Sequence, residues 1–284
     1  MLSRALRAVD GAITKAGAST LECSAVLKAS RELAAAPRAV PARAKRKTRA
    51  LERSLGLKPS FGGALCALEH RACAVMTRLG FGWVEANEVC DVQTNFFNLN
   101  FSRLHPAVSR LDTFYASAGA SVLRTHTTAF AVRALSSASG APFRSFTIGK
   151  VYRRDDDSKH LPSFTQLEGL VAEAKLCVAS AVKLLKRAVY EILEWRSSTR
   201  VRRAAFPFTS PSIEVDAFAG SALAPTSVWH KWLEVAGAGV IRECVAPAHA
   251  GGVFAFGMGL ERLLMTKLGV VDLRPAFGSQ PAPR

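Results

Sequence analysis

Short β-prone runs alternate along the chain with longer stretches of helical periodicity. Runs rich in β-branched and aromatic residues, bounded by turn residues, predict strands at 143–153, 164–174, 213–218, 229–235 and 253–257. Apolar residues at helical spacing predict helices at 64–79, 127–136, 178–195 and 259–268. Because the strands follow one another like hairpins and the helices stand apart from them, the pattern indicates an α+β fold with an antiparallel sheet.

Residues 1–56 differ in character from the rest of the chain. They are rich in Ala, Arg and Lys, they have a helical pattern, and Pro37 and Pro41 interrupt them. Between residues 42 and 55 cations point nearly all round the predicted helix, and Leu51 and Leu55 form only a narrow apolar stripe. We interpret 1–56 as a basic helical arm and 57–284 as the main domain. The arm is either a solvated surface or an RNA contact.

Composition and charge favour a nucleic-acid partner. The 284 residues, 49% of them hydrophobic, suffice for one large domain and an appendage. The formal net charge is +16, and residues 1–60 hold 13 Lys and Arg against four acids. A protein this basic commonly binds a polyanion, although an Arg-rich genome is an alternative reason for the charge.

Several classes of protein are disfavoured by what the sequence lacks. No cysteine pair has CxxC spacing, no Cys/His cluster resembles a zinc site, and no apolar run reaches the roughly 18 residues of a membrane span. Neither GxGxxG nor GxxxxGK[ST] is present, so a nucleotide would be held by other means. We interpret the first residues, MLSRALRAV, as an ordinary helix start; an organellar presequence is the alternative.

Two neighbouring predicted strands carry charged and polar pairs. Arg153 and Asp155 share one face of the first, where a guanidinium could bind a phosphate and a carboxylate a purine amine. Taken alone, this pair is more typical of a surface salt bridge. Gln166 and Glu168 share a face of the next strand, after a short loop that contains His160, and their side chains suit an ammonium group. Together the pairs suggest a site for a charged ligand.

Aromatic and small residues suggest a pocket for an aromatic ligand. Phe206 and Phe208 are expected on one face; such pairs usually belong to a core but can also line a pocket. Near the end, a strand with small Ala255 and Gly257 on one face leads into a helix carrying Arg262. Small residues leave room for a ligand, and an arginine beside the free N–H groups of a helix start favours an anion. A Gly-rich strand–helix corner is the alternative.

These motifs resemble those of class II aminoacyl-tRNA synthetases. FGMGLERLLM is similar to motif 3 of that class, and GKVYRRD followed by FTQLEGLV is similar to motif 2. Together with LRTHTT, FPFTSP and WLEVAGAGV, they resemble the α subunit of phenylalanyl-tRNA synthetases from about residue 76 to 277. The resemblance implies an antiparallel sheet flanked by helices. It also implies ATP-dependent formation of phenylalanyl-adenylate, followed by transfer of phenylalanine to tRNA(Phe).

The resemblance also implies a role for individual residues. Arg153 is similar to the arginine on the ATP α-phosphate and the phenylalanine carboxylate, and Arg262 to the arginine on the γ-phosphate; these would be the catalytic pair. Asp155, His160 and Glu234 resemble other ATP-site residues, Glu234 with a possible contact to ATP-bound Mg²⁺. The positions that match the phenylalanine site are His126, Thr128, Gln166, Glu168, Phe206, Phe208, Ala255 and Gly257.

The sequence also departs from the family pattern. Asn87 replaces the motif 1 proline, Thr165 the histidine of FHQ, and Thr128 a serine of the amino-acid site. Ser210 replaces the acid after FPFT, which in the family helps bind a magnesium ion shared with the β subunit. We therefore expect that shared metal site to be lost or weakened.

The family resemblance implies partners and a location, and two alternative assignments compete with it. It implies an α2β2 assembly with the β subunit, the substrates ATP, phenylalanine and tRNA, Mg²⁺, a cytoplasmic location and no membrane contact. A single-chain synthetase would continue past motif 3 into an anticodon-binding domain, and is disfavoured. A non-catalytic paralogue that binds amino acids or RNA is the other alternative, and the presence of both Arg153 and Arg262 argues against it.

Overall fold

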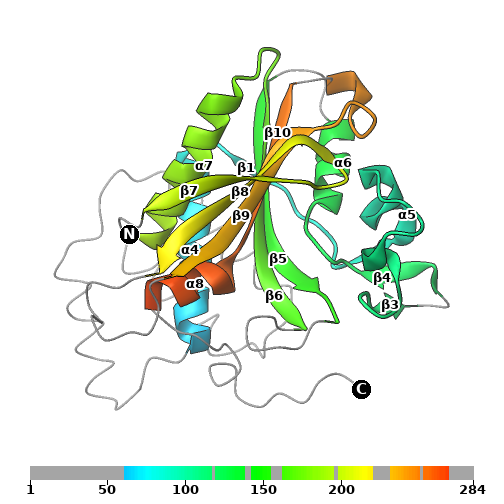
Figure 1. Ribbon diagram of the computed structural model, residues 1–284, viewed down its shortest axis with the longest axis horizontal. Helices are drawn as coiled ribbons and strands as arrows, with labels where there is room; N and C mark the ends of the chain where they lie inside the picture. The colour runs from blue at the N-terminus through cyan, green and yellow to red at the C-terminus, as the bar shows by residue number, and fades with distance from the viewer. Residues whose placement is uncertain are drawn as a thin grey trace, which may run out of the picture. The chain divides into compact units, whose positions relative to one another are not determined.

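The computed structural model describes residues 61–116, 119–137, 142–154, 162–194, 198–219, 231–249 and 252–268. Within them lies a seven-stranded sheet of order β1-β5-β6-β10-β9-β8-β7 (Figure 1). Its strands are β1 (Gly82–Trp83), β5 (Phe143–Tyr152), β6 (Ser163–Ala172), β7 (Thr199–Ala204), β8 (Thr209–Ala219), β9 (Lys231–Ile241) and β10 (Val253–Gly259). Strand β1 is parallel to β5 and all other neighbours are antiparallel, which confirms the expected fold class.

Helices and a second, small sheet complete the described domain. The longer helices are α4 (Phe61–Arg78), α6 (Ala129–Ser137), α7 (Val178–Leu193) and α8 (Leu260–Leu268). The small sheet has the order β2-β4-β3, with β2 (Val89–Asp91), β3 (Tyr115–Ala116) and β4 (Ser121–Leu123). The short elements are α5 (Val92–Asn95) and the 3-10 helices η1 (Phe97–Leu99), η2 (Pro106–Val108) and η4 (Pro247–His249). The small sheet and β7 were not predicted from the sequence.

Helices α4, α7 and α8 cover one face of the large sheet (Figure 1). Helix α7 buries Ala181, Leu185, Ala188 and Ile192, whose spacing of three to four residues places them on one side of the helix. The strands contribute every second residue to this core, as Phe254, Phe256 and Met258 do in β10. Burial of this apolar surface is the main source of stability for such a fold.

The opposite face of the sheet is covered only in part. Helix α6 packs Phe130 and Leu135 against Leu170 and Ala172 of β6, and against Ala255 of β10. Further along the same strands, on the same face, polar and small residues take over from apolar ones. The candidate site lies on this part of the sheet.

The predicted arm, 1–56, lies outside the described residues, so the division of the chain at residue 56 stays a prediction. Among the helices that the structure describes, none is both long and apolar enough to span a membrane.

Candidate active site

A cavity of about 580 Å³ lies on the partly covered face of the large sheet. The residues that the sequence assigned to ATP and phenylalanine, and that the structure describes, all line it. They are His126, Thr128, Arg153, Gln166, Glu168, Phe206, Phe208, Glu234, Ala255, Gly257 and Arg262. The predicted residues Asp155 and His160 lie outside the described part of the chain. The structure thus brings together side chains that lie more than 130 positions apart in the sequence.

The floor of the cavity is built from small residues on two adjacent strands. Ala255 and Gly257 of β10 lie opposite Gly239 and Gly237 of β9 in the antiparallel register. All four line the cavity. A Cβ on Gly237 would lie 2.9 Å from the Phe206 ring, so that side chain packs directly over the glycine. A Cβ on Gly257 would likewise lie 2.6 Å from Gln166 Nε2, so the glycines leave room for the Phe206 and Gln166 side chains to lie close to the strands.

Aromatic rings form one wall of the cavity. Phe206 and Phe208 stack with their ring centroids 6.0 Å apart and their planes 16° apart. They lie in the turn between β7 and β8, which places both rings on one side, as expected. Phe101 stacks on both Phe208 and His126, with centroid distances of 6.1 and 5.8 Å, and the rings of Phe208 and His126 lie 6.2 Å from each other. The wall therefore suits an aromatic ligand.

Glu168 is a buried carboxyl group held by hydroxyl groups. It is 2% exposed, and its Oε2 accepts hydrogen bonds from the hydroxyls of Thr127 at 2.7 Å and Thr128 at 2.9 Å. Gln166 Nε2 lies 3.4 Å from the same oxygen, as their shared strand face requires. Burial raises the pKa of Glu168 to about 7, although the two hydroxyls and the charge of Arg124 act in the opposite direction. The group therefore changes charge in the neutral range.

His126 and Gln166 present polar atoms without partners to the cavity. Three buried atoms have no hydrogen-bond partner among the described residues: both ring nitrogens of His126 and Oε1 of Gln166. Burial and the neighbouring charge of Arg153 lower the pKa of His126 to about 3, so the imidazole is neutral. Buried polar atoms without partners are rare in native proteins, and a ligand at this position would supply their hydrogen bonds.

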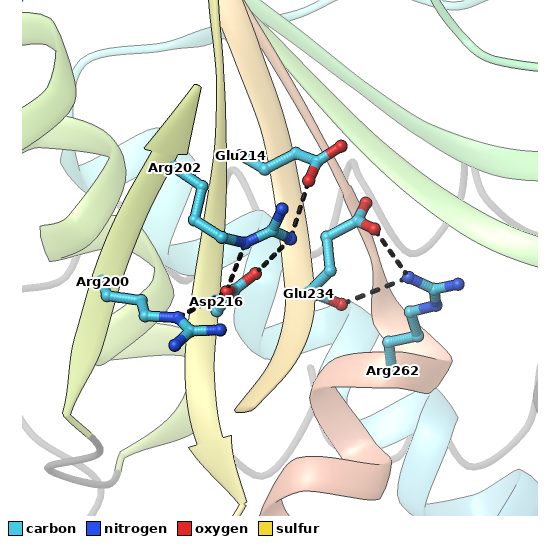
Figure 2. Close-up of polar contacts among 6 residues, drawn as sticks. All are labelled: Arg200, Arg202, Glu214, Asp216, Glu234 and Arg262. Carbon is cyan, nitrogen blue, oxygen red and sulfur yellow. Dashed lines mark hydrogen bonds and ion pairs between the residues drawn. The ribbon is translucent and has the colours of Figure 1, made fainter. Parts of the chain in front are cut away.

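Two arginines reach the cavity from different elements. Arg153 follows the end of β5; its Nε donates to the carbonyl of Thr125 at 3.0 Å, and its guanidinium lies over the Phe164 ring. Arg262, in the first turn of α8, lies 3.3 Å from a carboxylate oxygen of Glu234 (Figure 2). Both side chains line the same cavity as Glu168, which gives that cavity two fixed positive charges.

A second ion-pair network lies on the outer strands of the sheet, next to the Glu234–Arg262 pair (Figure 2). Asp216 of β8, 1% exposed, accepts hydrogen bonds from Arg200 at 2.8 Å and Arg202 at 2.6 Å, and Arg202 also pairs with Glu214. Hydrogen bonds from the two arginines lower the pKa of Asp216. This network fixes the edge strand β7, which the polar sequence TRVRRA does not reveal as a strand.

Several residues in or next to the cavity were not singled out from the sequence. Thr127 stands in the quoted motif LRTHTT, but its bond to Glu168 spans 41 positions. Gly237 and Gly239 stand in WLEVAGAGV, and only the pairing of β9 with β10 places them in the floor. Glu261 of motif 3 is 2% exposed, and its carboxylate accepts the Thr165 backbone N–H at 2.7 and 2.9 Å. All four residues stand in motifs quoted above, but only the fold gives them these contacts.

The cavity offers few side chains that could bind a magnesium ion. No group of three or more His, Cys, Asp or Glu side chains among the described residues could hold a metal on its own. Glu234 lines the cavity with a half-exposed carboxylate beside Arg262. Mg²⁺ keeps several waters and commonly takes one or two carboxylates together with phosphate oxygens, so this donor set fits an ion carried by a nucleotide. Ser210 is exposed and lies outside the cavity lining.

Comparison with known proteins agrees with the geometry. Residues 64–281 match the family model described as "tRNA synthetases class II core domain (F)". The phenylalanine–tRNA ligase alpha subunit of Coxiella burnetii (strain RSA 493 / Nine Mile phase I) is 38% identical over 216 residues, which cover 74% of this chain and 63% of that protein. The protein of the same name from Desulfatibacillum aliphaticivorans is 38% identical over 224 residues, covering 75% and 66%.

A solved structure shares the fold. The pyrrolysyl-tRNA synthetase from Desulfitobacterium hafniense superposes with a TM-score of 0.62 over 83% of this chain and 80% of that one, at 22% identity. The chain spans less than two thirds of the length of the curated relatives named above. Since the family model covers most of the chain, this protein belongs to the family of class II tRNA synthetase core domains.

Proposed function

We propose that the chain is the catalytic subunit of a phenylalanine–tRNA ligase, which activates phenylalanine with ATP and transfers it to tRNA(Phe). One observation carries this proposal: a single cavity holds a buried carboxyl group, an aromatic wall over a glycine floor, and two arginines. The names of the relatives that match the chain support the same assignment.

The cavity suits each part of the amino acid. The Glu168 carboxylate would bind the ammonium group, and the unpartnered Gln166 Oε1 would accept a further hydrogen bond from it. The phenyl ring would lie above the small residues of the floor, against the rings of Phe206 and Phe208. The α-carboxylate would then face Arg153, whose guanidinium the contact with Thr125 already orients.

The proposed reaction needs positive charge more than a nucleophilic side chain. A carboxylate oxygen of phenylalanine attacks the α-phosphorus of ATP, the bond to the β-phosphate oxygen breaks, and pyrophosphate leaves with its electron pair. Arg153 and Arg262 would stabilise the charge that gathers on the phosphate oxygens, because fixed cations in a partly dry site need no reorganisation. Mg²⁺ on the phosphates would add positive charge at the leaving group. The 3′-terminal ribose of tRNA then attacks the activated carbonyl and releases AMP.

Partners follow from the same proposal. The described domain holds the candidate activation site, and a β subunit in an α2β2 assembly would supply further tRNA contacts. The basic arm predicted at 1–56 would add contacts to tRNA phosphates. A non-catalytic paralogue would have no need for both arginines in the cavity, which favours the catalytic reading.

Phenylalanine-dependent pyrophosphate–ATP exchange, measured with and without a β subunit, tests the proposal. The parent protein should catalyse exchange, and Arg153→Ala or Arg262→Ala should lower its rate by about 10²-fold or more. Arg144→Ala, on β5 but outside the cavity, is the matched control and should keep the parent rate. Exchange that is absent from the assembled parent, or normal in both cavity variants, would refute the assignment.

A further inference from the structure

Arg124 is a buried arginine directly behind the candidate site, and it does not line the cavity. Its side chain is 2% exposed. Its Nε donates to the carbonyl of Lys150 at 2.7 Å, and its Nη1 donates to the carbonyls of Ala86 at 2.7 Å and Asn87 at 3.2 Å. These three acceptors are neutral carbonyl oxygens. A cation buried at this depth is costly to keep, and loss of one partner would be strongly destabilising, so its retention calls for a function.

The backbone of Arg124 joins the small sheet to the large one. Its N–H donates to the carbonyl of Glu88 at 2.9 Å, and its carbonyl accepts the N–H of Tyr152, at the end of β5, at 2.9 Å. The residues that follow serve the cavity: the carbonyl of Thr125 orients Arg153, and the hydroxyls of Thr127 and Thr128 bind Glu168. Arg124 therefore anchors the start of segment 125–128.

The charge of Arg124 acts on two site residues in useful directions. It lowers the pKa of Glu168, which burial raises, and it lowers the pKa of His126. Among the described residues, the groups that hydrogen-bond to Glu168 or pair with it in the sheet carry no charge. They are the hydroxyls of Thr127 and Thr128, the amide of Gln166 on its own strand, and the register partners Gly257 on β10 and Thr147 on β5. The carboxylate of Glu168 thus has Arg124 as its source of positive charge among these neighbours.

Gly149 makes room for the Arg124 head group. A Cβ at position 149 would lie 2.1 Å from Arg124 Nη2 and 3.3 Å from Cζ. The guanidinium is held by three carbonyls and has little freedom to move aside. The glycine of GKVYRRD is therefore explained by the arginine of LRTHTT, two motifs that lie far apart in the sequence.

We propose that Arg124 is a positioning residue that acts through Glu168: its contacts with three carbonyls hold segment 125–128, whose hydroxyls bind the Glu168 carboxyl group, beneath the bound amino acid, and its buried charge favours the ionised form of that group. The inference rests on the proposed function in one respect, that Glu168 binds the ammonium group of the substrate. The charge on Glu168 can be measured without that assumption.

The test is the titration of Glu168, followed by ¹³C NMR of protein labelled at the glutamate carboxyl carbon and assigned with Glu168→Gln. Arg124→Gln should move the titration of Glu168 to higher pH, whereas Arg124→Lys, which keeps the charge, should leave it near the parent value. In exchange assays below pH 7, kcat/KM for phenylalanine should fall about tenfold for each pH unit of that movement. Arg144→Gln, a half-exposed arginine on the same strand as Lys150, is the matched control and should change neither measurement.

A second variant keeps the test decisive if Arg124→Gln does not fold. Gly149→Ala retains the charge but displaces the guanidinium, and it should also move the Glu168 titration upward. If Glu168 titrates in the folded variants as it does in the parent, the inference is refuted. If the titration moves as expected but the parent shows no phenylalanine-dependent exchange, the proposed function is refuted and the positioning role of Arg124 stands.

Discussion

Replacement of Gly257 by alanine should affect the activity of the protein but not its stability. An added Cβ would lie 2.6 Å from Gln166 Nε2 and 3.8 Å from Glu168 Oε2. Ordinary contact begins near 3.4 Å, so the Gln166 amide must move by about 0.8 Å. That amide is the end of a flexible side chain and its contact with Glu168 is long, at 3.4 Å, so the fold should absorb the change.

The ligand site cannot absorb the same movement. The new methyl group occupies the floor, and the displaced amide no longer faces the ammonium position beside Glu168. A misplacement of about 1 Å can cost about 10²-fold in rate, so kcat/KM for phenylalanine in pyrophosphate exchange should fall by about that factor. The unfolding midpoint of the variant should lie close to that of the parent.

Gly239→Ala is the matched control because it lies in the same floor and has the opposite kind of neighbour. Its Cβ would lie 2.5 Å from the backbone oxygen of Pro211 and 2.7 Å from the Cβ of Thr209. A backbone clash forces strain into the strand pair, and we expect a loss of about 1–3 kcal/mol in the free energy of unfolding. If Gly257→Ala unfolds as early as Gly239→Ala, or if it keeps normal exchange, the floor does not have the role proposed for it.

Four further predictions concern the cavity, the arm and the assembly. Because burial raises the pKa of Glu168 to about 7, its carboxylate is present above that pH and lost below it; kcat/KM for phenylalanine should fall about tenfold per pH unit below 7, and Glu168→Gln should lack this dependence. Ala255→Gly should enlarge the cavity at the floor and allow activation of para-halogenated phenylalanines. If the variant activates these analogues no faster than the parent does, Ala255 does not line the pocket for the ring. Deletion of residues 1–56 should weaken tRNA binding and reduce the slope of log K for that binding against log salt concentration. An unchanged slope would indicate that the arm is a solvated surface without contacts to tRNA phosphates. Because Ser210 replaces a carboxylate, EDTA without ATP should leave the complex with a β subunit intact; dissociation that Mg²⁺ reverses would contradict this.

The strand pattern of the sequence was sufficient to bring two pairs of cavity residues together. Since side chains alternate along a strand, the spacing of Gln166 and Glu168 already puts them on one face, and their contact at 3.4 Å agrees. The same period places Ala255 and Gly257 together, and both line the cavity. These inferences depend only on local geometry, which is why they survive comparison with the structure.

Relations between distant segments could not be read in this way. The two hydroxyls on Glu168 come from a segment about 40 residues earlier, and Gly237 reaches the floor only through the register between β9 and β10. The stack of Phe206 and Phe208 depends on a turn, where a period of two does not apply. Strand β7 was missed because TRVRRA lacks apolar alternation: its arginines pair with Asp216 and Glu214 instead of packing in a core.

Two departures from the family pattern, at positions 165 and 87, leave the side chains of the cavity unchanged. Thr165 replaces a histidine, but it alternates with Gln166 along β6, so its hydroxyl lies on the other face, where it accepts from Lys150 Nζ and donates to Glu69. Its backbone N–H, which any residue would offer, binds Glu261. Asn87 replaces a proline and contributes its carbonyl to Arg124, a group that proline also has.

Position 128 is a departure that lies in the cavity lining itself. Thr128 keeps the hydroxyl that a serine would offer, and that hydroxyl binds Glu168 at 2.9 Å. The added methyl group is fixed at χ1 by the branched side chain, so it should hold the hydroxyl in place more firmly than serine does. Thr128→Ser should therefore leave exchange near the parent rate, whereas Thr128→Val, which keeps the shape and removes the hydroxyl, should raise the pKa of Glu168 and with it the KM for phenylalanine near pH 7. An unchanged KM in the valine variant would show that Thr127 alone holds the carboxylate.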